Sequence, residues 1–139
     1  MSENPIFRSV APANLPDNFF SRIGDDWMLI TAGTTEDCNT MTASYGGFGI
    51  LFSKTVAHVY IRPHRHTYLF TEKADHFSLS FFDGEKYRKE LQYCGKVSGR
   101  DENKLNKLSH KVENGVLTFD DANITLVGKK IYYSDIDTK

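Results

Sequence analysis

The stretch WMLITA at residues 27–32 and the stretch CNTMTAS at residues 38–44 decide the fold that we expect for this chain. The first has the length and the β-branched content of a buried strand, and the second is typical of another strand after a polar segment. Because so few residues separate them, the two can pair as a hairpin. The sequence therefore predicts a fold built on a β-sheet.

Further strands follow along the chain, with helices inserted between them. The segment TVAHVYIR at 55–62 alternates between two faces and ends at Pro63, whereas Gly46, Gly47 and Gly49 interrupt the pattern before it. The segment HFSLSFF at 76–82 has two usable faces. Other strands are expected at 116–119 and 124–133, with a turn at 120–121, and helices at 15–23, 66–74, 85–93 and 102–108.

This order of elements favours a mainly β fold, a β-barrel with peripheral helices. A doubly wound parallel sheet would instead alternate strands and helices throughout. With 139 residues the chain has room for one domain with a substantial core, but not for two. We therefore expect a single domain over residues 1–139, in which residues 1–14 form an arm.

Composition and charge narrow the class of protein. Hydrophobic residues make up 40% of the chain, and 17 Lys+Arg against 18 Asp+Glu leave a net charge of -1. This composition excludes a disordered chain, and it lacks the basic field of a general nucleic-acid binder. A local basic pocket for one small phosphate group stays open as a hypothesis.

The cysteines and the amino terminus bear on the compartment. Cys38 and Cys94 are widely separated, so we interpret them as reduced thiols rather than as a CxxC motif. No apolar stretch approaches the length of a membrane span, and no signal-peptide pattern opens the chain. The sequence therefore predicts a cytoplasmic protein that does not cross a membrane.

The segment Arg62-Pro63-His64-Arg65-His66-Thr67 is the most informative candidate site. A strand ends there at a proline, and two guanidinium groups and a hydroxyl are offered at the start of the next helix. Arginine donates paired hydrogen bonds to phosphate oxygens, and a helix amino terminus adds free N–H groups and a favourable dipole. The pattern indicates a phosphate site, and exposed arginines on a loop are the alternative.

Two other segments offer donors and close backbone approach. Residues 39–44, NTMTAS, precede a glycine-rich stretch and could hold a flat heterocycle, although the same pattern fits the outward face of a strand. Residues 94–101, CGKVSGRD, form a glycine-rich link between two expected helices. Neither segment is decisive when it is taken alone.

Metal binding is a competing interpretation. His64 and His66 stand two apart with Glu72 downstream, a spacing that resembles the ligands of a cupin barrel. Pro63 breaks the strand that such a motif requires, and His58 fits a histidine inside a barrel. No nucleophile elbow, HExxH motif, phosphate-binding GxxxxGK loop or dinucleotide glycine fingerprint is present.

Five segments together carry a family resemblance. WMLITAG, NTMTASYGGFG, RPHRHTY, SLSFF and CGKVSGRD occur in the order and approximate spacing of the flavin reductase-like, flavoredoxin-type proteins, over about residues 23–137. This resemblance implies an FMN-binding split β-barrel, usually a homodimer with the flavin near the subunit interface.

The resemblance also implies which residues hold the cofactor. Residues 39–44 would bind the isoalloxazine ring and ribityl chain, residues 62–67 would bind the phosphate, and residues 98–101 would close the pocket. The residues so implied are Asn39, Thr40, Met41, Thr42, Ala43 and Ser44; Arg62, Pro63, Arg65 and Thr67; and Cys94, Ser98, Gly99, Arg100 and Asp101.

The chain departs from the family pattern at three places. Tyr45 stands where the family often has tryptophan, and His64 and His66 stand where it often has glutamine and tyrosine. The histidines would make the phosphate pocket sensitive to pH. Relatives commonly continue with a further carboxy-terminal segment and another strand, which we expect to be absent here.

By resemblance, the activity is hydride transfer from NADH or NADPH to the N5 atom of bound FMN, followed by delivery of electrons to free flavin or a protein acceptor. No side chain needs to act as an acid or base, so no catalytic residue is assigned and no metal is expected. The first alternative is an electron carrier that holds FMN without NAD(P)H turnover. The second is a metal-binding barrel that uses His64 and His66.

Overall fold

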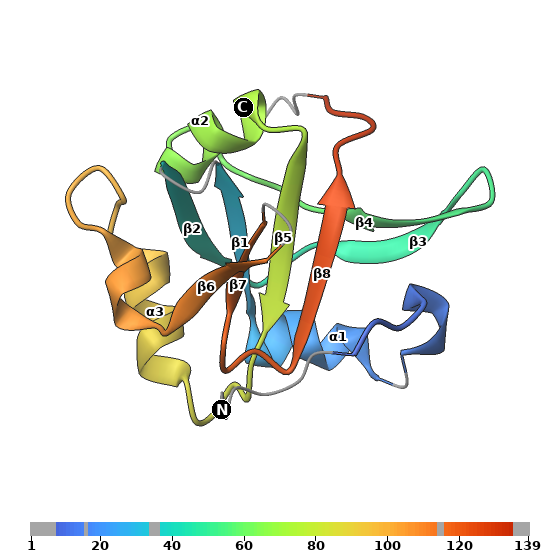
Figure 1. The fold of residues 1–139 in the computed structure, drawn as a ribbon, viewed down its shortest axis with the longest axis horizontal. Coiled ribbons are helices and arrows are strands. Elements are labelled where there is room, and N and C mark those ends of the chain that lie inside the picture. Colours follow the sequence, from blue (N-terminus) through green and yellow to red (C-terminus); the bar gives the residue numbers. More distant parts are fainter. Residues whose placement is uncertain (1–7, 16, 34–36, 114–115, 135–139) are drawn as a thin grey trace.

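A four-stranded antiparallel sheet in the order β2–β1–β5–β8 lies at the centre of the molecule (Figure 1). The computed structural model describes residues 8–15, 17–33, 37–113 and 116–134. The sheet strands are β1 Met28–Gly33, β2 Cys38–Ala43, β5 His76–Phe81 and β8 Ile124–Lys129. Separate hairpins pair β3 Gly47–Leu51 with β4 Lys54–His58, and β6 His110–Glu113 with β7 Val116–Phe119.

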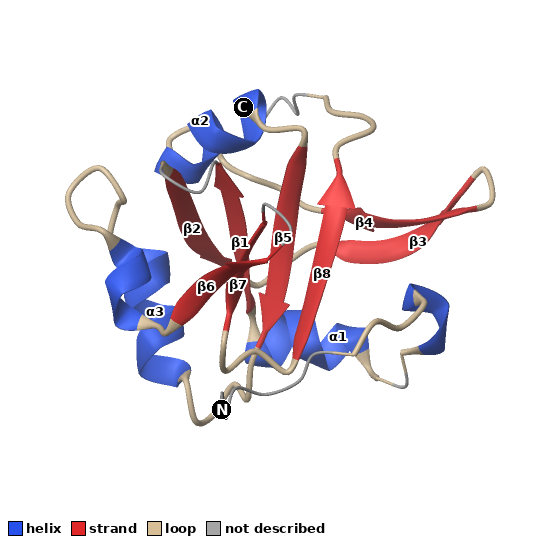
Figure 2. Ribbon diagram, viewed as in Figure 1, coloured by secondary structure: helices blue, strands red, loops and turns tan. Residues whose placement is uncertain are grey.

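The fold is mainly β, as expected, and its strands form separate sheets instead of one closed barrel (Figure 2). The predicted hairpin of the two opening strands is confirmed, with Met28 opposite Ala43 and Gly33 opposite Cys38. β1 is central, because it also pairs with β5 on its other side. β2 therefore lies at an edge of this sheet.

Two hydrophobic clusters pack on the two faces of the sheet. One cluster includes Leu29 and Phe82 and joins the sheet to α3 Arg88–Lys96 through Leu91, and to β7 through Phe119. The other includes Ile30 and Phe81 and joins it to the amino-terminal helical segment and to β4. Phe81 and Phe82 are adjacent in sequence and both fully buried, which confirms the prediction of two usable faces for this strand.

Helix α2, His66–Lys73, crosses the end of the sheet at which β1 and β2 are joined (Figure 1). This helix confirms the expectation for residues 66–74. α3 lies beside β2 and begins three residues later than the helix expected at 85–93. The helix expected at 102–108 is a short 3-10 helix, η3, Lys104–Lys107.

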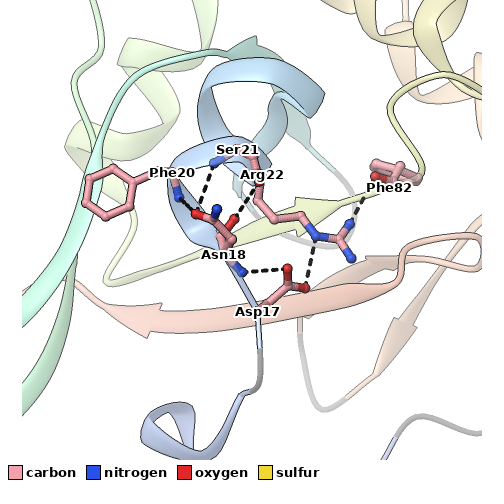
Figure 3. A network of polar contacts seen from close by, with 6 residues as sticks. All are labelled: Asp17, Asn18, Phe20, Ser21, Arg22 and Phe82. Atoms are coloured by element: carbon pink, nitrogen blue, oxygen red, sulfur yellow. Dashed lines mark hydrogen bonds and ion pairs between the residues drawn. The ribbon is translucent and has the colours of Figure 1, made fainter.

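The single helix expected at 15–23 is wrong, because the segment is broken into short pieces. The turn η1 Pro12–Asn14 precedes it, and the segment itself holds the helix α1 Phe19–Ser21 and the start of the π-helical turn η2 Arg22–Asp26. Asn18 caps α1 by accepting from the backbone N–H groups of Phe20 and Ser21, at 3.1 and 3.4 Å (Figure 3). The side chain of Asn18 thus fixes the start of α1.

Arg22 ties this segment to the sheet. Its Nε donates to the carboxylate of Asp17 at 3.0 Å, and its Nη1 donates to the carbonyl of Phe82 at 3.3 Å (Figure 3). The second contact spans 60 positions of sequence. Sequence periodicity does not report a long-range contact of this kind.

Four strands also differ from the expectation. β3 forms through the glycine-rich stretch that we expected to interrupt the pattern, and β6 was not expected at all. β4 ends at His58, short of the proline at 63, and β8 ends at Lys129 rather than at 133. In the hairpin of β3 and β4, the partner strand supplies the pairing that the glycine composition does not suggest.

In the part of the chain that the structure describes, no helix is both long and apolar enough to cross a membrane.

Candidate functional site

The unpaired edge of β2 forms one side of the candidate site. Within the described sheet β2 pairs only with β1, so the backbone N–H and C=O groups of its other edge have no strand partner. α2, α3 and η3 pack around this strand. The segment predicted to bind a flat heterocycle therefore lies on an edge strand in a setting of three helical elements.

The side chains of this segment differ in what they can reach. Met41 and Ala43 are buried in the hydrophobic cluster with Ile30, so their side chains are closed to a ligand. The hydroxyl of Thr40 is buried, lies 2.9 Å from that of Thr31 and donates to the carbonyl of Ile30 at 3.2 Å.

Thr42 and Ser44 lie toward the other end of the strand from Asn39. The hydroxyl of Thr42 donates to the carbonyl of Leu91 at 2.5 Å and so joins β2 to α3. Ser44 follows β2 and is exposed. At a rise of ~3.3 Å per residue, Ser44 is roughly 16 Å from Asn39, so the site is elongated along the strand.

Asn39 and Thr67 meet where β2 begins. The Nδ2 atom of Asn39 donates to the hydroxyl oxygen of Thr67 at 2.8 Å, and both side chains are buried. Thr67 is the second residue of α2, whose N-cap residue Arg65 makes no side-chain capping bond. The hydroxyl hydrogen of Thr67 and the first N–H groups of α2 are donors of the kind that hold an anion.

The two arginines predicted to bind phosphate differ in their exposure and in their contacts. Arg62 is exposed, and its carbonyl accepts from the backbone N–H of Arg65 at 3.0 Å in the turn that precedes α2. Arg65 is half-buried, and its Nη2 donates to the carbonyl of Cys94 at 3.5 Å. Pro63 is exposed in the same turn. The turn thus places both arginines just before the amino-terminal end of α2.

The link between α3 and η3 crosses the start of β2. A Cβ atom placed on Gly99 would lie 2.1 Å from Oδ1 of Asn39, so the backbone of the link lies directly against this amide. The backbone N–H of Arg100 donates to the hydroxyl of Ser98 at 3.1 Å, and its Nη1 donates to the carbonyl of His64 at 3.1 Å. Asp101 is exposed, and its N–H donates to the carbonyl of Ser98 at 3.0 Å.

Sequence reasoning missed Lys104. Its side chain is only 2% exposed, and its ammonium donates to the carbonyl of Cys94 at 2.9 Å. Burial, and then the charge of Arg65, lower the pKa of Lys104 from 10.5 to about 8. The sequence shows only another lysine in a polar segment, and no pattern signals that this one is buried.

The pKa values of His66 and Cys94 are also shifted by burial. His66 replaces an aromatic residue of the family pattern, and its buried Nδ1 has no hydrogen-bond partner in the described chain. Burial, and then the charges of Arg100 and Lys104, lower its pKa below 6.5, so the imidazole is neutral at pH 7. Burial raises the pKa of Cys94 to about 11, which keeps this thiol protonated.

Two cavities open beside this corner, under α2. Their volumes are about 410 and 680 Å³, and both are lined by His66, Phe70 and Leu117. The smaller one also reaches Asn39 and Gly99. The described residues contain no cluster of three or more histidine, cysteine, aspartate or glutamate side chains that could hold a metal ion.

The structure thus brings together residues from all three predicted segments. Asn39, Arg65, Thr67, Gly99 and Arg100 surround one corner at the start of β2. The carbonyl of Cys94 lies there as well, whereas its thiol packs in the hydrophobic cluster of α3. The last residues of the segment 39–44, including Ser44, lie at the other end of β2, away from this corner.

The fold is that of the FMN-binding split barrels found among flavin reductase-like proteins. No protein-family model matches the sequence, and no curated protein matches it. Similarity is instead found to solved structures, at 16–20% sequence identity for those described below.

The names of the similar structures refer to flavins or to FMN. Flavoredoxin from Methanosarcina acetivorans superposes with a TM-score of 0.70 at 17% identity, over 79% of this chain and 59% of that one. An FMN-binding protein from Thermus thermophilus, solved with bound p-hydroxybenzaldehyde, gives 0.72 at 20%, over 94% and 73%. An FMN-binding domain of a flavin reductase-like enzyme from Shewanella baltica gives 0.67 at 16%, over 82% and 62%. This chain therefore spans less than two thirds of the length of the first and the third.

Proposed function

We propose that this protein binds FMN along the free edge of β2 and acts as a flavin reductase-like oxidoreductase. The observation that carries the proposal is the convergence of Asn39, Thr67 and Gly99 with the side chains of Arg65 and Lys104 at one end of that strand. A ligand with a terminal phosphate and a flat ring fits an elongated site of this kind. The names of the similar structures support the same cofactor.

The donors at the corner suit a phosphate group. Arg65 and Arg62 supply guanidinium groups, Thr67 supplies a hydroxyl, and the first turn of α2 supplies backbone N–H groups. Gly99 fits the role of closing the corner, since any side chain there would collide with Asn39. These residues would anchor the phosphate and fix the position of the ligand.

The rest of β2 would face the ring. Its unpaired backbone groups and the exposed hydroxyl of Ser44 can hydrogen-bond the polar edge of a heterocycle. Tyr45 and Tyr60 lie beyond Ser44 with ring centroids 6.4 Å apart and give this end an aromatic border. FMN, when bound, supplies the hydride-accepting chemistry, and the protein supplies position and electrostatics.

We further infer that the protein works as a homodimer in the cytoplasm. The hairpin of β3 and β4 projects from the sheet (Figure 1), and its residues Ile50 and Phe52 are 72% and 90% exposed. Apolar side chains gathered on one projecting element are typical of a contact surface. A second copy packed on this hairpin would cover them.

The test is an absorption spectrum of the purified protein with and without added FMN, followed by anaerobic titration with NADH and then NADPH. Flavin bands that shift on binding and bleach with one nucleotide would support the oxidoreductase and identify its donor. Bands that bleach with dithionite but with neither nucleotide would support the electron carrier instead. Unchanged free-flavin spectra at all concentrations would contradict both.

A further inference from the structure

The charges of this chain are unevenly distributed. Residues 86–111 contain eight Lys and Arg against three Asp and Glu, a net charge of +5, whereas the other residues contain nine against fifteen, a net charge of -6. The structure folds much of this segment into one region, where α3, the link after it and η3 lie beside β2 (Figure 1). A molecule of nearly zero net charge thus carries a basic region.

The outer side of α3 carries part of this charge. Lys89 and Lys96 are exposed and stand seven positions apart, so they project from the same side of the helix. On the opposite side Leu91 and Cys94 are fully buried in the hydrophobic cluster that joins α3 to the sheet. The two lysines therefore point away from the sheet.

A third lysine extends this surface onto η3. Lys107 is exposed, and its ammonium lies 4.9 Å from the ring centroid of Tyr93. Tyr93 lies one turn from both Lys89 and Lys96 on the same side of α3. We name Lys89, Lys96 and Lys107, together with Tyr93, the basic face.

No carboxylate within α3 is placed to pair with the lysines of this helix. Within α3 the positions one turn from Lys89 and Lys96 are held by Gln92 and Tyr93, so the usual lysine–carboxylate pairing along a helix is missing. Lys89, Lys96 and Lys107 form no ion pair within 4.0 Å with another described residue. Their charges are directed to solvent.

The three acidic residues of the segment offset the basic face only in part. Oε2 of Glu90 is buried, and Glu102 accepts a hydrogen bond from the hydroxyl of Tyr93. Asp101 is exposed in the link that precedes η3. The region therefore keeps an excess of positive charge, and an aromatic side chain lies among its lysines, which is typical of protein interfaces.

We propose that the basic face docks a partner protein with an acidic surface, which accepts electrons from the bound flavin. The electron transfer rests on the proposed function, whereas the docking surface rests on the charges. Complementary charge steers short-lived encounters, and complexes of redox proteins need little buried area. For a partner that carries one electron, two oxidised partner molecules each take one electron from FMNH2, which leaves FMN and releases two protons.

The position of the basic face suits this role. The hydroxyl of Thr42 donates to the carbonyl of Leu91, so α3 lies directly against the strand proposed to hold the flavin. A helix with its side chains is about 10 Å across. A partner on the outer side of α3 would thus be one helix width from β2.

Two other occupants fit the charge distribution less well. A nucleic acid would be repelled by the rest of the chain, whose net charge of -6 exceeds that of the basic region. A second copy could place its acidic part on the basic face, but such a head-to-tail contact does not close unless it forms a ring. An acidic partner of another kind meets neither obstacle.

The first experiment measures association with two haem proteins of opposite charge, an acidic b-type cytochrome and a basic c-type cytochrome. It is done with and without added FMN at ionic strengths of about 0.02 and about 0.2 M, between which the Debye length falls from roughly 20 to roughly 7 Å. We expect the acidic cytochrome to bind at low ionic strength and to weaken roughly tenfold or more at the higher one. The basic cytochrome should not bind.

The variants compare Lys89→Glu with Lys96→Glu, as a double change, against Lys73→Glu with Lys129→Glu. Both doubles have the same net charge, and Lys73 is exposed in the last turn of α2 as Lys96 is in the last turn of α3. The first double should weaken the acidic cytochrome roughly tenfold or more, and the control less than twofold. Equal losses would overturn the proposal.

Two further measurements keep the test independent of folding and locate the contact. If the melting temperature falls in the first double, Lys89→Gln with Lys96→Gln replaces it, against Lys73→Gln with Lys129→Gln, and the same order of losses is expected. A carbodiimide joins a lysine amine to a partner carboxylate as an amide, with loss of water. Links at Lys89, Lys96 or Lys107 would support the basic face, and links chiefly at Lys73 or Lys129 would overturn it.

The remaining outcomes separate this inference from the proposed function. No association with the acidic cytochrome, or tighter binding of the basic one, would overturn the docking surface even where FMN binds. Docking at the basic face by a protein that binds no FMN would support the surface and contradict the proposed function. Binding of single-stranded nucleic acid, or self-association of the wild type, that the first double removes would assign the face to those occupants and overturn the proposal.

Discussion

Gly99 and Asn39 are packed so closely that a Cβ atom on Gly99 would lie 2.1 Å from Oδ1 of Asn39. The backbone of the link after α3 is thus in direct contact with a side chain near the start of strand β2. The same amide donates to Thr67 through Nδ2, so the contact extends to α2. Three segments far apart in sequence therefore share one buried amide.

Gly99→Ala should disturb this corner directly. The added methyl group must displace Asn39 or the link, and overpacking of this kind costs about 1–3 kcal/mol of unfolding free energy. FMN affinity should fall as well, because the link would no longer close over Asn39. Gly47→Ala is the control, since a Cβ there meets nothing within 4 Å. Urea unfolding and FMN titration of both variants measure the two effects, and equal behaviour of the variants would contradict the contact.

Thr67→Val should separate the effect of the hydroxyl group from the effect of the side-chain volume. Valine keeps the volume but leaves the buried Nδ2 of Asn39 without its acceptor, at a cost of about 1–3 kcal/mol. The phosphate would also lose a donor, so FMN should weaken more than riboflavin. Thr55→Val, at an exposed position of β4, is the matched control. A loss confined to stability, with an unchanged ratio of the two affinities, would remove Thr67 from the phosphate site.

The two arginines should give different results. Arg62→Ala removes an exposed side chain, so the unfolding free energy should change by less than about 0.5 kcal/mol. Arg65→Ala also removes a donor to the carbonyl of Cys94 and should lower stability by about 1 kcal/mol. The double variant should weaken FMN far more than riboflavin, because neither group contacts the ring. Parallel losses for both ligands would exclude the phosphate assignment.

The stability of the ligand-free protein should depend on pH through Lys104. Between its folded pKa of about 8 and the unfolded value of 10.5, the native state releases a proton that the unfolded chain keeps. Stability of the wild type should therefore rise with pH across this window, by about 2 kcal/mol between pH 7 and pH 9.5, relative to Lys104→Met. Denaturant unfolding at the two pH values checks this, and a wild-type minus variant difference that does not change with pH would contradict it.

Phe52→Ser should weaken self-association. Phe52 is 90% exposed at the tip of the projecting hairpin, and in a dimer it would be covered by the second copy. Analytical ultracentrifugation should show a dimer for the wild type and a shift toward monomer for the variant. Val112→Ser, on the β6–β7 hairpin, serves as the control and should leave the dimer unchanged. A wild-type monomer at all concentrations would contradict the proposed assembly.

The sequence predicted the central elements well, because their signals are local. β1, β2 and β5 have β-branched or alternating patterns, and α2 begins shortly after Pro63. β3 was missed because Gly47 and Gly49 have low strand propensity, and cross-strand pairing with β4 overrides it. Local patterns could not report that pairing.

The candidate site was predictable in its parts but not in its arrangement. The motifs around Arg65 and Gly99 were visible as separate segments, and the structure brings them to one corner. Burial of the Met41 side chain follows from which face of β2 meets the sheet's core, which alternation alone leaves open. Lys104 could not be found from sequence, because its burial depends on how the link folds back after α3.

The carbonyl oxygen of Cys94 accepts from Arg65 and from Lys104, so residues 29 and 10 positions away meet at one atom. Closing the longer of these two loops costs more entropy, so we expect the contact of Arg65 to form after that of Lys104. The corner that they share joins segments that are distant in sequence. Local opening there, seen as amide hydrogen exchange in the last turn of α3, should precede opening of the sheet, and a bound phosphate ester should slow it.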